Sequence, residues 1–319
     1  MKRLHSLSFS LILFGILSPL AHAEGKIRIV VSVDWEGREL APDNIEKMKA
    51  FRRDYPDVPL EMFLNAAYYF KPGADPKLIT ETIRSVLLPG DEHGLHIHGW
   101  KSLIEASGVK FRTEPAFKGP LDLSACTPDC GHDVNISAYS EKELRKVIRT
   151  SVATLTKNGF NHPKSFRAGA WQSDKKVMNA LAEEGFTLDS SATDAEYLKE
   201  RWGKTLLYPV VKKNWPETTS SSQPYRVQLS NQKSIVQLPN NGCLADYVTG
   251  EQILAAFQAN VAKLKENPNA DQYLSIGFHQ ETAVKYLDKL RSGIDLIRAD
   301  AKKQNVNIEF VVPPLTLTH

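Results

Sequence analysis

The chain has 319 residues, of which 40 are lysine or arginine and 37 are aspartate or glutamate. This near balance gives no support for nucleic-acid binding, which normally shows as a strongly basic domain. A chain of this length can bury a large core, so we expect one main domain.

The first 23 residues have the layout of a cleavable secretory signal. Lys2 and Arg3 precede an apolar stretch at 7–20, and Ala-His-Ala follows at 21–23. The stretch is shorter than the roughly 20 apolar residues that a membrane-spanning helix needs, and no later segment is long and apolar enough to span a bilayer. We therefore predict a signal peptide at 1–23 and a mature domain at 24–319, periplasmic or secreted, with 38 basic residues against 37 acidic ones.

Strands and helices are predicted to alternate along the mature chain, from short β-branched runs and from helical spacing of apolar residues. The expected strands are 26–33, 58–64, a strand through the histidine-rich residues 91–100, 164–167, 186–189, 273–279 and 307–312, with two or three more within 206–238. The expected helices are 45–54, 76–88, 140–157, 173–184, 250–266 and 282–304. A long loop is expected at 107–137 and an irregular stretch at 201–222. Such alternation predicts a parallel sheet, either open or closed into a barrel.

Asp34 and Glu36 follow the first predicted strand and share one face, while Trp35 points the other way. One of these acids can be held on a metal while the other takes a proton from water. The alternative is a pair of ordinary surface acids, which the buried character of the preceding strand makes the weaker interpretation.

Three histidines lie close together in residues 91–100, DEHGLHIHGW. On a strand, His96 and His98 share one face and His93 faces away. Two neutral imidazoles and a carboxylate from elsewhere suit zinc or a similar divalent ion. Solvated histidines at a polar strand end are the alternative, and the clustering argues against it.

Cys126 and Cys130 are predicted to form a small loop disulfide, as expected in an oxidising compartment. A zinc knuckle would need a second Cys/His pair at matching spacing, so we favour the disulfide. The remaining Cys243 is expected to be a buried apolar filler rather than a nucleophile.

Two further side chains stand at predicted strand ends. His279 is followed by an acid and could be a tuned acid catalyst or a satisfied core histidine. Arg167 suits a buried carboxylate, although a purely structural ion pair is equally common. Trp35, Trp100 and Trp171 could stack on sugar rings, but tryptophan is more often part of the core.

Taken in order, these segments resemble the motifs of the polysaccharide deacetylase family, the NodB-like carbohydrate esterases. SVDWEG at 32–37 resembles the first motif, usually Thr-Phe-Asp-Asp-Gly, and EHGLHIH at 92–98 resembles the metal-binding histidine motif. Residues 58–64 resemble the family's second strand, and residues 165–171 resemble its arginine motif. Residues 185–191 resemble the segment after that motif, and residues 275–279 resemble the closing histidine motif. The matches span residues 27–281.

The resemblance implies an α/β fold, a distorted (β/α) barrel of about seven strands, with its site at the carboxyl ends of the strands. It also implies one divalent metal, with zinc the first choice, and a single catalytic domain that removes acetyl groups from N-acetylated sugars. The implied roles are general base for Asp34, general acid for His279, orientation of Asp34 for Arg167, metal ligands for Glu36, His96 and His98, and support near the site for Asp189. Trp100 and Trp171 are our candidates for substrate contact, from their ability to stack on sugar rings.

The chain departs from the family pattern at the metal. Asp-Trp-Glu replaces the adjacent aspartates, so the roles of Asp34 and Glu36 could be reversed. The two histidines are separated by one residue instead of three, and Trp100, at the old second position, cannot bind a metal. A hydrolase of a small non-sugar amide and a non-catalytic polysaccharide-binding protein of the envelope remain as alternatives. Retention of Asp34 and His279 argues against the second. No protein partner is indicated.

Overall fold

The structure is a computed structural model that describes residues 25–313. The predicted signal peptide at 1–23 lies outside the described residues. Within them, no helix combines the length and the apolar character that crossing a membrane requires.

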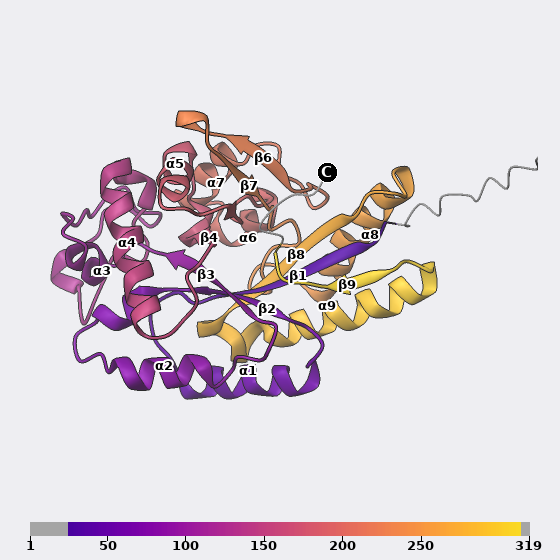
Figure 1. Cartoon of the computed structure of the whole chain (residues 1–319), viewed down its shortest axis with the longest axis horizontal. Coiled ribbons are helices and arrows are strands. Elements are labelled where there is room, and N and C mark those ends of the chain that lie inside the picture. The colour runs from indigo at the N-terminus through magenta and orange to yellow at the C-terminus, as the bar shows by residue number, and fades with distance from the viewer. Residues whose placement is uncertain (1–24, 314–319) are drawn as a thin grey trace, which may run out of the picture.

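A curled sheet runs through the middle of the domain, with strand order β6-β7-β5-β4-β3-β2-β1-β8 and with β9 also paired to β1 (Figure 1). Every pair is parallel except β6 with β7. The strands are β1 (Ile27–Asp34), β2 (Leu60–Leu64), β3 (Glu92–Ile97), β4 (Ser165–Ala168), β5 (Leu188–Asp189), β6 (Tyr225–Gln228), β7 (Ser234–Gln237), β8 (Gln272–His279) and β9 (Ile308–Phe310).

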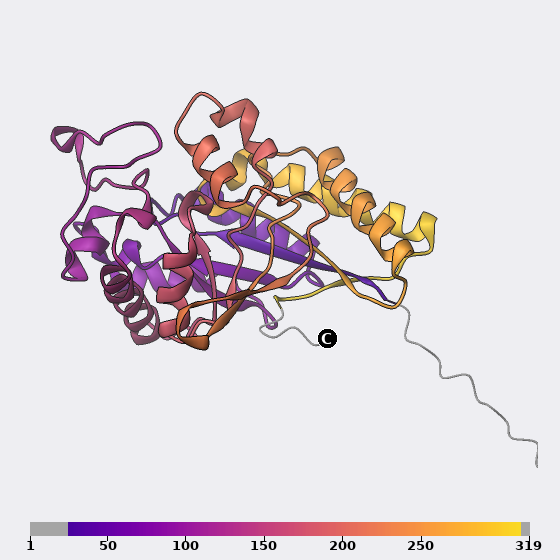
Figure 2. The same ribbon diagram turned by 90° about the horizontal axis from the view of Figure 1, so that it is seen from above.

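Helices cover the outside of this sheet (Figures 1 and 2). They are α1 (Pro42–Asp54), α2 (Pro76–Arg84), α3 (Lys101–Ala106), α4 (Glu141–Lys157), α5 (Lys175–Glu183), α6 (Lys199–Trp202), α7 (Leu207–Asn214), α8 (Gly250–Glu266) and α9 (Ala283–Gln304). Helix α9 packs against both α1 and α8, and α4 packs against α5.

The segment after β7 closes the sheet into a distorted barrel. The amide of Gly242 donates to the carbonyl of Ser275 at 2.9 Å, and that of Ala245 donates to Gly277 at 2.8 Å. These bonds attach the segment to β8, the opposite end of the strand order. The predicted barrel is therefore confirmed, with nine strands in the sheet. Two strands lie outside the ring of seven, and both fall where strands were predicted: β6, an antiparallel addition to β7, and β9, which shares one edge of β1 with β2.

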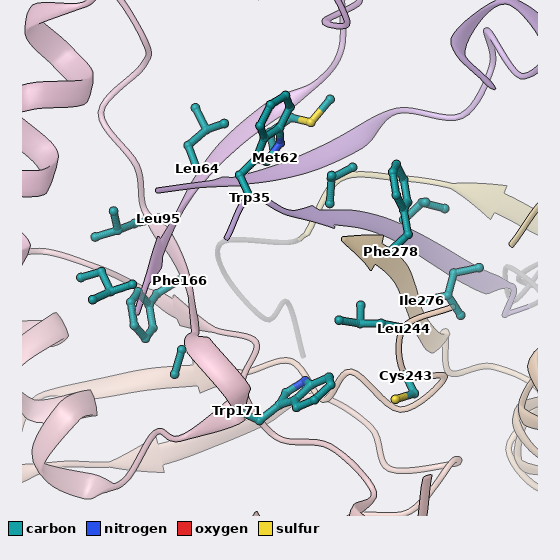
Figure 3. Packing of buried hydrophobic residues seen from close by; sticks show 14 of the residues in the cluster. Trp35, Met62, Leu64, Leu95, Phe166, Trp171, Cys243, Leu244, Ile276 and Phe278 are labelled. Atoms are coloured by element: carbon teal, nitrogen blue, oxygen red, sulfur yellow. The ribbon is translucent and has the colours of Figure 1, made fainter. Parts of the chain in front are cut away.

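Alternation along β1 separates two environments. Val31 and Val33 belong to the large apolar cluster under the helices, part of which is shown in Figure 3 with Trp35, Met62 and Phe278. Ser32 and Asp34 of β1 instead face the inside of the barrel, where both contact Arg167. Trp35 is fully buried in the outer cluster, as its predicted orientation required.

Most elements lie close to their predicted positions, and α8 agrees at both ends. Helix α1 begins earlier than expected, at Pro42, because proline suits the first helical turn. The stretch predicted to be irregular at 201–222 instead contains α7 and the end of α6. Its apolar residues Leu207 and Val211 are four apart and buried on one helical face.

Candidate active site

A buried ion pair lies inside the barrel at the carboxyl ends of β1 and β4. Nη1 of Arg167 donates to Oδ1 of Asp34 at 2.8 Å and to Oγ of Ser32 at 2.7 Å, and its Nε donates to the carbonyl of Ser190 at 3.0 Å. Both charged side chains are at most 3% exposed. Arg167 therefore fixes the orientation of the Asp34 carboxylate.

Four imidazoles surround the carboxylate of Glu36, two residues beyond Asp34. Nε2 of His96 and Nε2 of His279 lie 3.3 and 3.4 Å from Oε1. Nε2 of His98 and Nε2 of His132 lie 2.8 and 2.5 Å from Oε2. The carboxylate and all four rings are largely buried, so their charges and lone pairs interact with one another more than with water.

The other ring nitrogen of each histidine has a partner that can only accept a hydrogen bond. Nδ1 of His96 donates to the carbonyl of Arg167 at 2.8 Å, and Nδ1 of His98 donates to the carbonyl of His132 at 2.7 Å. Nδ1 of His132 donates to the Asp133 carboxylate at 2.8 Å, and Nδ1 of His279 forms an ion pair with the Asp246 carboxylate at 2.9 Å. In every ring, Nε2 is therefore the nitrogen directed at Glu36, an arrangement that is typical of metal-binding histidines.

The electrostatics of this cluster favour the protonation states that bind a metal, an ionised carboxylate and a neutral imidazole. Burial by itself raises the pKa of Glu36, but the surrounding histidines outweigh it and hold the pKa well below its usual range. Burial lowers the pKa of His98 to about 4, although Glu36 acts in the opposite direction. At neutral pH the cluster thus offers an ionised carboxylate and a neutral imidazole, as a divalent cation requires.

His279 has the opposite tendency. Burial alone would lower its pKa, but the carboxylates of Asp246 and Glu36 raise the pKa to about 10. Its Nδ1 is fixed by Asp246, which is itself held by the hydroxyl of Thr282 at 2.6 Å. His279 is therefore an imidazolium at neutral pH, with a proton on the nitrogen that faces the cluster.

The donor set fits a divalent metal such as zinc. Ligand atoms of Glu36, His98 and His132 lie within 4.8 Å of one another, and so do those of Asp34, Glu36 and His279. Nε2 of His98 is buried and makes no hydrogen bond of acceptable geometry, even though Glu36 is close. A buried imidazole nitrogen without a hydrogen bond is costly unless it has a ligand. Imidazole and carboxylate are both donors that zinc uses in catalytic sites.

A cavity of about 260 Å³ opens onto this cluster. Its charged wall includes Asp34, Glu36, His98, His132 and His279. Apolar and aromatic side chains also line it and form an aromatic wall, made of Phe117, Trp171, Trp202, Leu207 and Tyr247. A few converging polar groups facing an aromatic wall are typical of a small-molecule site.

Of the three residues predicted to contact or support the substrate, one lines the cavity and two do not. Trp171 lines the cavity. Trp100 does not line it; it is buried, and its Nε1 donates to the backbone carbonyl of Glu36 at 2.7 Å. Asp189 also lies away from the cavity, paired in register with Phe166, and accepts hydrogen bonds from Ser173 and Ser191.

His93 points away from the cluster and packs edge-on against Phe160, as its position on the strand predicted. The predicted disulfide between Cys126 and Cys130 is present, and Cys243 is a buried free thiol.

Two side chains at the site, His132 and Asp246, were not found from the sequence, and both lie outside helices and strands. Glu281, the acid noted near His279, lies in a short 3-10 turn. Burial and the charge of Glu36 raise the pKa of Glu281 to about 7. The sequence signal for His132 was weak, consisting of its position two residues after Cys130.

Comparison with solved structures shows the fold of this chain. No protein-family model matches the chain, and no curated protein matches it. A solved structure from Mycobacterium smegmatis, assigned to the polysaccharide deacetylases, superposes with a TM-score of 0.50 at 14% identity, covering 95% of this chain and 97% of that one. This chain has the fold of the polysaccharide deacetylases.

Two further solved structures are similar at lower scores. A family 4 carbohydrate esterase from Streptomyces lividans, in complex with acetate, has a TM-score of 0.41 at 10% identity, covering 88% of this chain and 89% of that one. A chitin deacetylase from Colletotrichum lindemuthianum has a TM-score of 0.41 at 11% identity and covers 92% of both chains.

Proposed function

We propose that this protein is a metal-dependent hydrolase that removes acetyl groups from N-acetylated sugars of a poly- or oligosaccharide. The observation that carries the proposal is the ring of imidazoles around Glu36, placed beside the Arg167–Asp34 pair at the carboxyl ends of the strands. The deacetylase fold supports the same reaction class. We also propose that residues 24–319 form one catalytic domain, exported through the signal at 1–23 to the periplasm or the medium.

Glu36, His96 and His98 would hold the metal, for which zinc is the first choice. When bound, such an ion lowers the pKa of a water molecule toward about 7 and polarises a carbonyl group. Glu36 is suited to this role because it lies among the Nε2 atoms, while Asp34 is held by Arg167. This assignment leaves Asp34 free to act on water.

Asp34 acts as the general base in this proposal. One of its oxygens accepts from Arg167, and its carboxylate lies at the wall of the cavity, so it can take a proton from the attacking water. Arg167 is a positioning residue because its remaining donors are committed to Ser32 and Ser190.

His279 acts as the general acid. The Asp246 carboxylate keeps it protonated, and the resulting proton on Nε2 faces the cavity. Donation of that proton allows the sugar amine to leave, with acetate as the second product. The proton that Asp34 takes from water and the proton that His279 gives to the amine balance over the reaction.

The aromatic wall would bind the sugar ring. Trp171 is the predicted platform that lines the cavity, with its Nε1 held by Asn240 at 3.2 Å and its ring edge-on to Tyr247. Trp100 would act indirectly, by fixing the backbone of Glu36. Asp189 would act through Ser191, whose hydroxyl accepts from the amide of Ala168, next to Arg167.

The test is metal content and acetate release from a panel of N-acetylated glycans, for the purified mature protein and for His96→Ala. His93→Ala is the matched control, because His93 lies on the same strand and points away. We expect stoichiometric metal and acetate release in the wild type and the control, with both lost in His96→Ala. Metal without acetate release would favour a small non-sugar amide as substrate, and a protein without metal would favour polysaccharide binding alone.

A further inference from the structure

The segment that carries His132 is fixed to the chain just beyond β3. The Cys126–Cys130 disulfide closes a ring of backbone within it. Inside that ring, Asp129 accepts from the amide of Ser102 at 3.1 Å and from its hydroxyl at 2.7 Å. The carbonyl of Cys130 accepts from the amide of Lys101 at 2.7 Å. The loop is therefore attached to the first turn of α3, three or four residues after His98.

A tight turn at Gly131 brings the next residue onto the site. Gly131 has φ +97°, and a Cβ there would overlap the carbonyl oxygen of Gly99 and the ring of Phe111. Only glycine has both this conformation and this close approach. The turn places the ring of His132 flat against that of His98, with centroids 4.0 Å apart and planes 13° apart.

His132 has the hydrogen bonds of a metal ligand. Its Nε2 lies 2.5 Å from Oε2 of Glu36, and its Nδ1 donates to Asp133, which is paired with Lys118 at 2.9 Å. Its backbone carbonyl accepts from Nδ1 of His98 and so orients the ring of His98. Its ligand atom lies within 4.8 Å of those of Glu36 and His98.

We propose that His132 is a further ligand of the metal, beside Glu36, His96 and His98, supplied by the disulfide-closed loop. The proposal rests on the proposed metal-dependent function and adds to it a ligand from outside the strand motifs. The competing interpretation is that His132 is an imidazolium that pairs with Glu36 only when no metal is present. The two interpretations predict opposite effects of removing His132 on metal affinity. Removing a ligand weakens metal binding, whereas removing a competing cation leaves it unchanged or strengthens it.

The experiment measures zinc affinity by competition with a chromophoric chelator, and the visible absorption of the cobalt(II) form, for the mature protein. We expect His132→Ala to bind zinc at least tenfold more weakly and to change the cobalt spectrum, since even residues that only support metal ligands give 10- to 100-fold effects. His93→Ala should match the wild type in both measurements. Circular dichroism of the metal-free proteins checks that each variant is folded.

His132→Gln provides a second test, because its amide can keep a hydrogen bond to Asp133 while losing the imidazole. If His132→Ala does not fold, weaker zinc binding by His132→Gln supports the proposal, and unchanged binding overturns it. Wild-type affinity in folded His132→Ala also overturns it while leaving the metalloenzyme proposal intact. Failure of the wild type itself to bind zinc or cobalt overturns both.

Discussion

Glu61 on β2 is a buried carboxylic acid beneath the site, and its substitution should change how stability depends on pH. The side chain is 2% exposed and accepts a hydrogen bond from the hydroxyl of Ser165. Burial raises the pKa of Glu61 from 4.5 to about 7, and the Ser165 hydroxyl offsets only part of that shift. When Glu61 is protonated it carries no charge, so it does not compete with Asp34 for the positive charge of Arg167.

The magnitude follows from the difference in pKa between the folded and unfolded chains. Below about pH 4.5 the group is protonated in both states and contributes no pH dependence. As the pH rises from 4.5 to 7 the unfolded chain ionises first, so the free energy of unfolding falls. At 1.36 kcal/mol per pH unit the loss reaches about 3 kcal/mol above pH 7. Glu61→Gln cannot ionise and should lack this loss.

The assay is urea unfolding of wild type and Glu61→Gln at pH 5 and pH 8, with Glu81→Gln on the exposed face of α2 as the control. All other titrating groups cancel in the difference between the proteins. Between pH 5 and pH 8 the free energy of unfolding of Glu61→Gln should rise by about 2 to 3 kcal/mol relative to that of wild type. That of the control should not change relative to wild type. The same wild-type-to-variant difference at both pH values would refute the argument that burial sets this pKa.

Four further predictions concern the site. Replacing both Cys126 and Cys130 with serine should leave the fold intact by circular dichroism and weaken zinc binding by up to about 30-fold, because a five-residue ring restricts the open loop by about 2 kcal/mol; unchanged affinity would mean that the loop is held without the bond. Arg167→Ala should destabilise the protein by about 3 to 5 kcal/mol in urea unfolding, since it leaves the Asp34 carboxylate buried and unpaired; a loss below 1 kcal/mol would contradict this. His279→Ala should keep its metal and lose about 10²- to 10⁴-fold in kcat for acetate release, and full activity would remove the proposed acid. Dialysis against a chelator should abolish acetate release, with recovery on adding zinc; activity that survives complete metal removal would exclude the proposed mechanism.

Much of the fold could be predicted because the signals are local. The alternation of β1 places Asp34 toward the barrel and Trp35 toward the helices, and both positions are confirmed. His96 and His98 converge on one carboxylate, although His98 lies one residue beyond β3, because the extended backbone continues past the last strand pairing. The site therefore follows in part from a two-residue period within two short segments.

Other features depend on which segments meet in space. Asp189 lies on a two-residue strand whose register with β4 turns it toward Ser173 and leaves the neighbouring Ser190 to contact Arg167. Sequence adjacency to a motif could not show this, because a shift of one residue reverses the face of a strand.

What the sequence determined by itself is the order of strands and helices and the residues at the carboxyl ends of the strands, because hydrophobic period and turn chemistry act over short stretches of chain. What only the tertiary structure decided is the remainder of the site. His132 comes from a loop 96 residues after Glu36, and Asp246 comes from the irregular segment that closes the barrel. Neither segment has a hydrophobic period that would predict its structure. The conformation of such loops is set by contacts with distant parts of the chain.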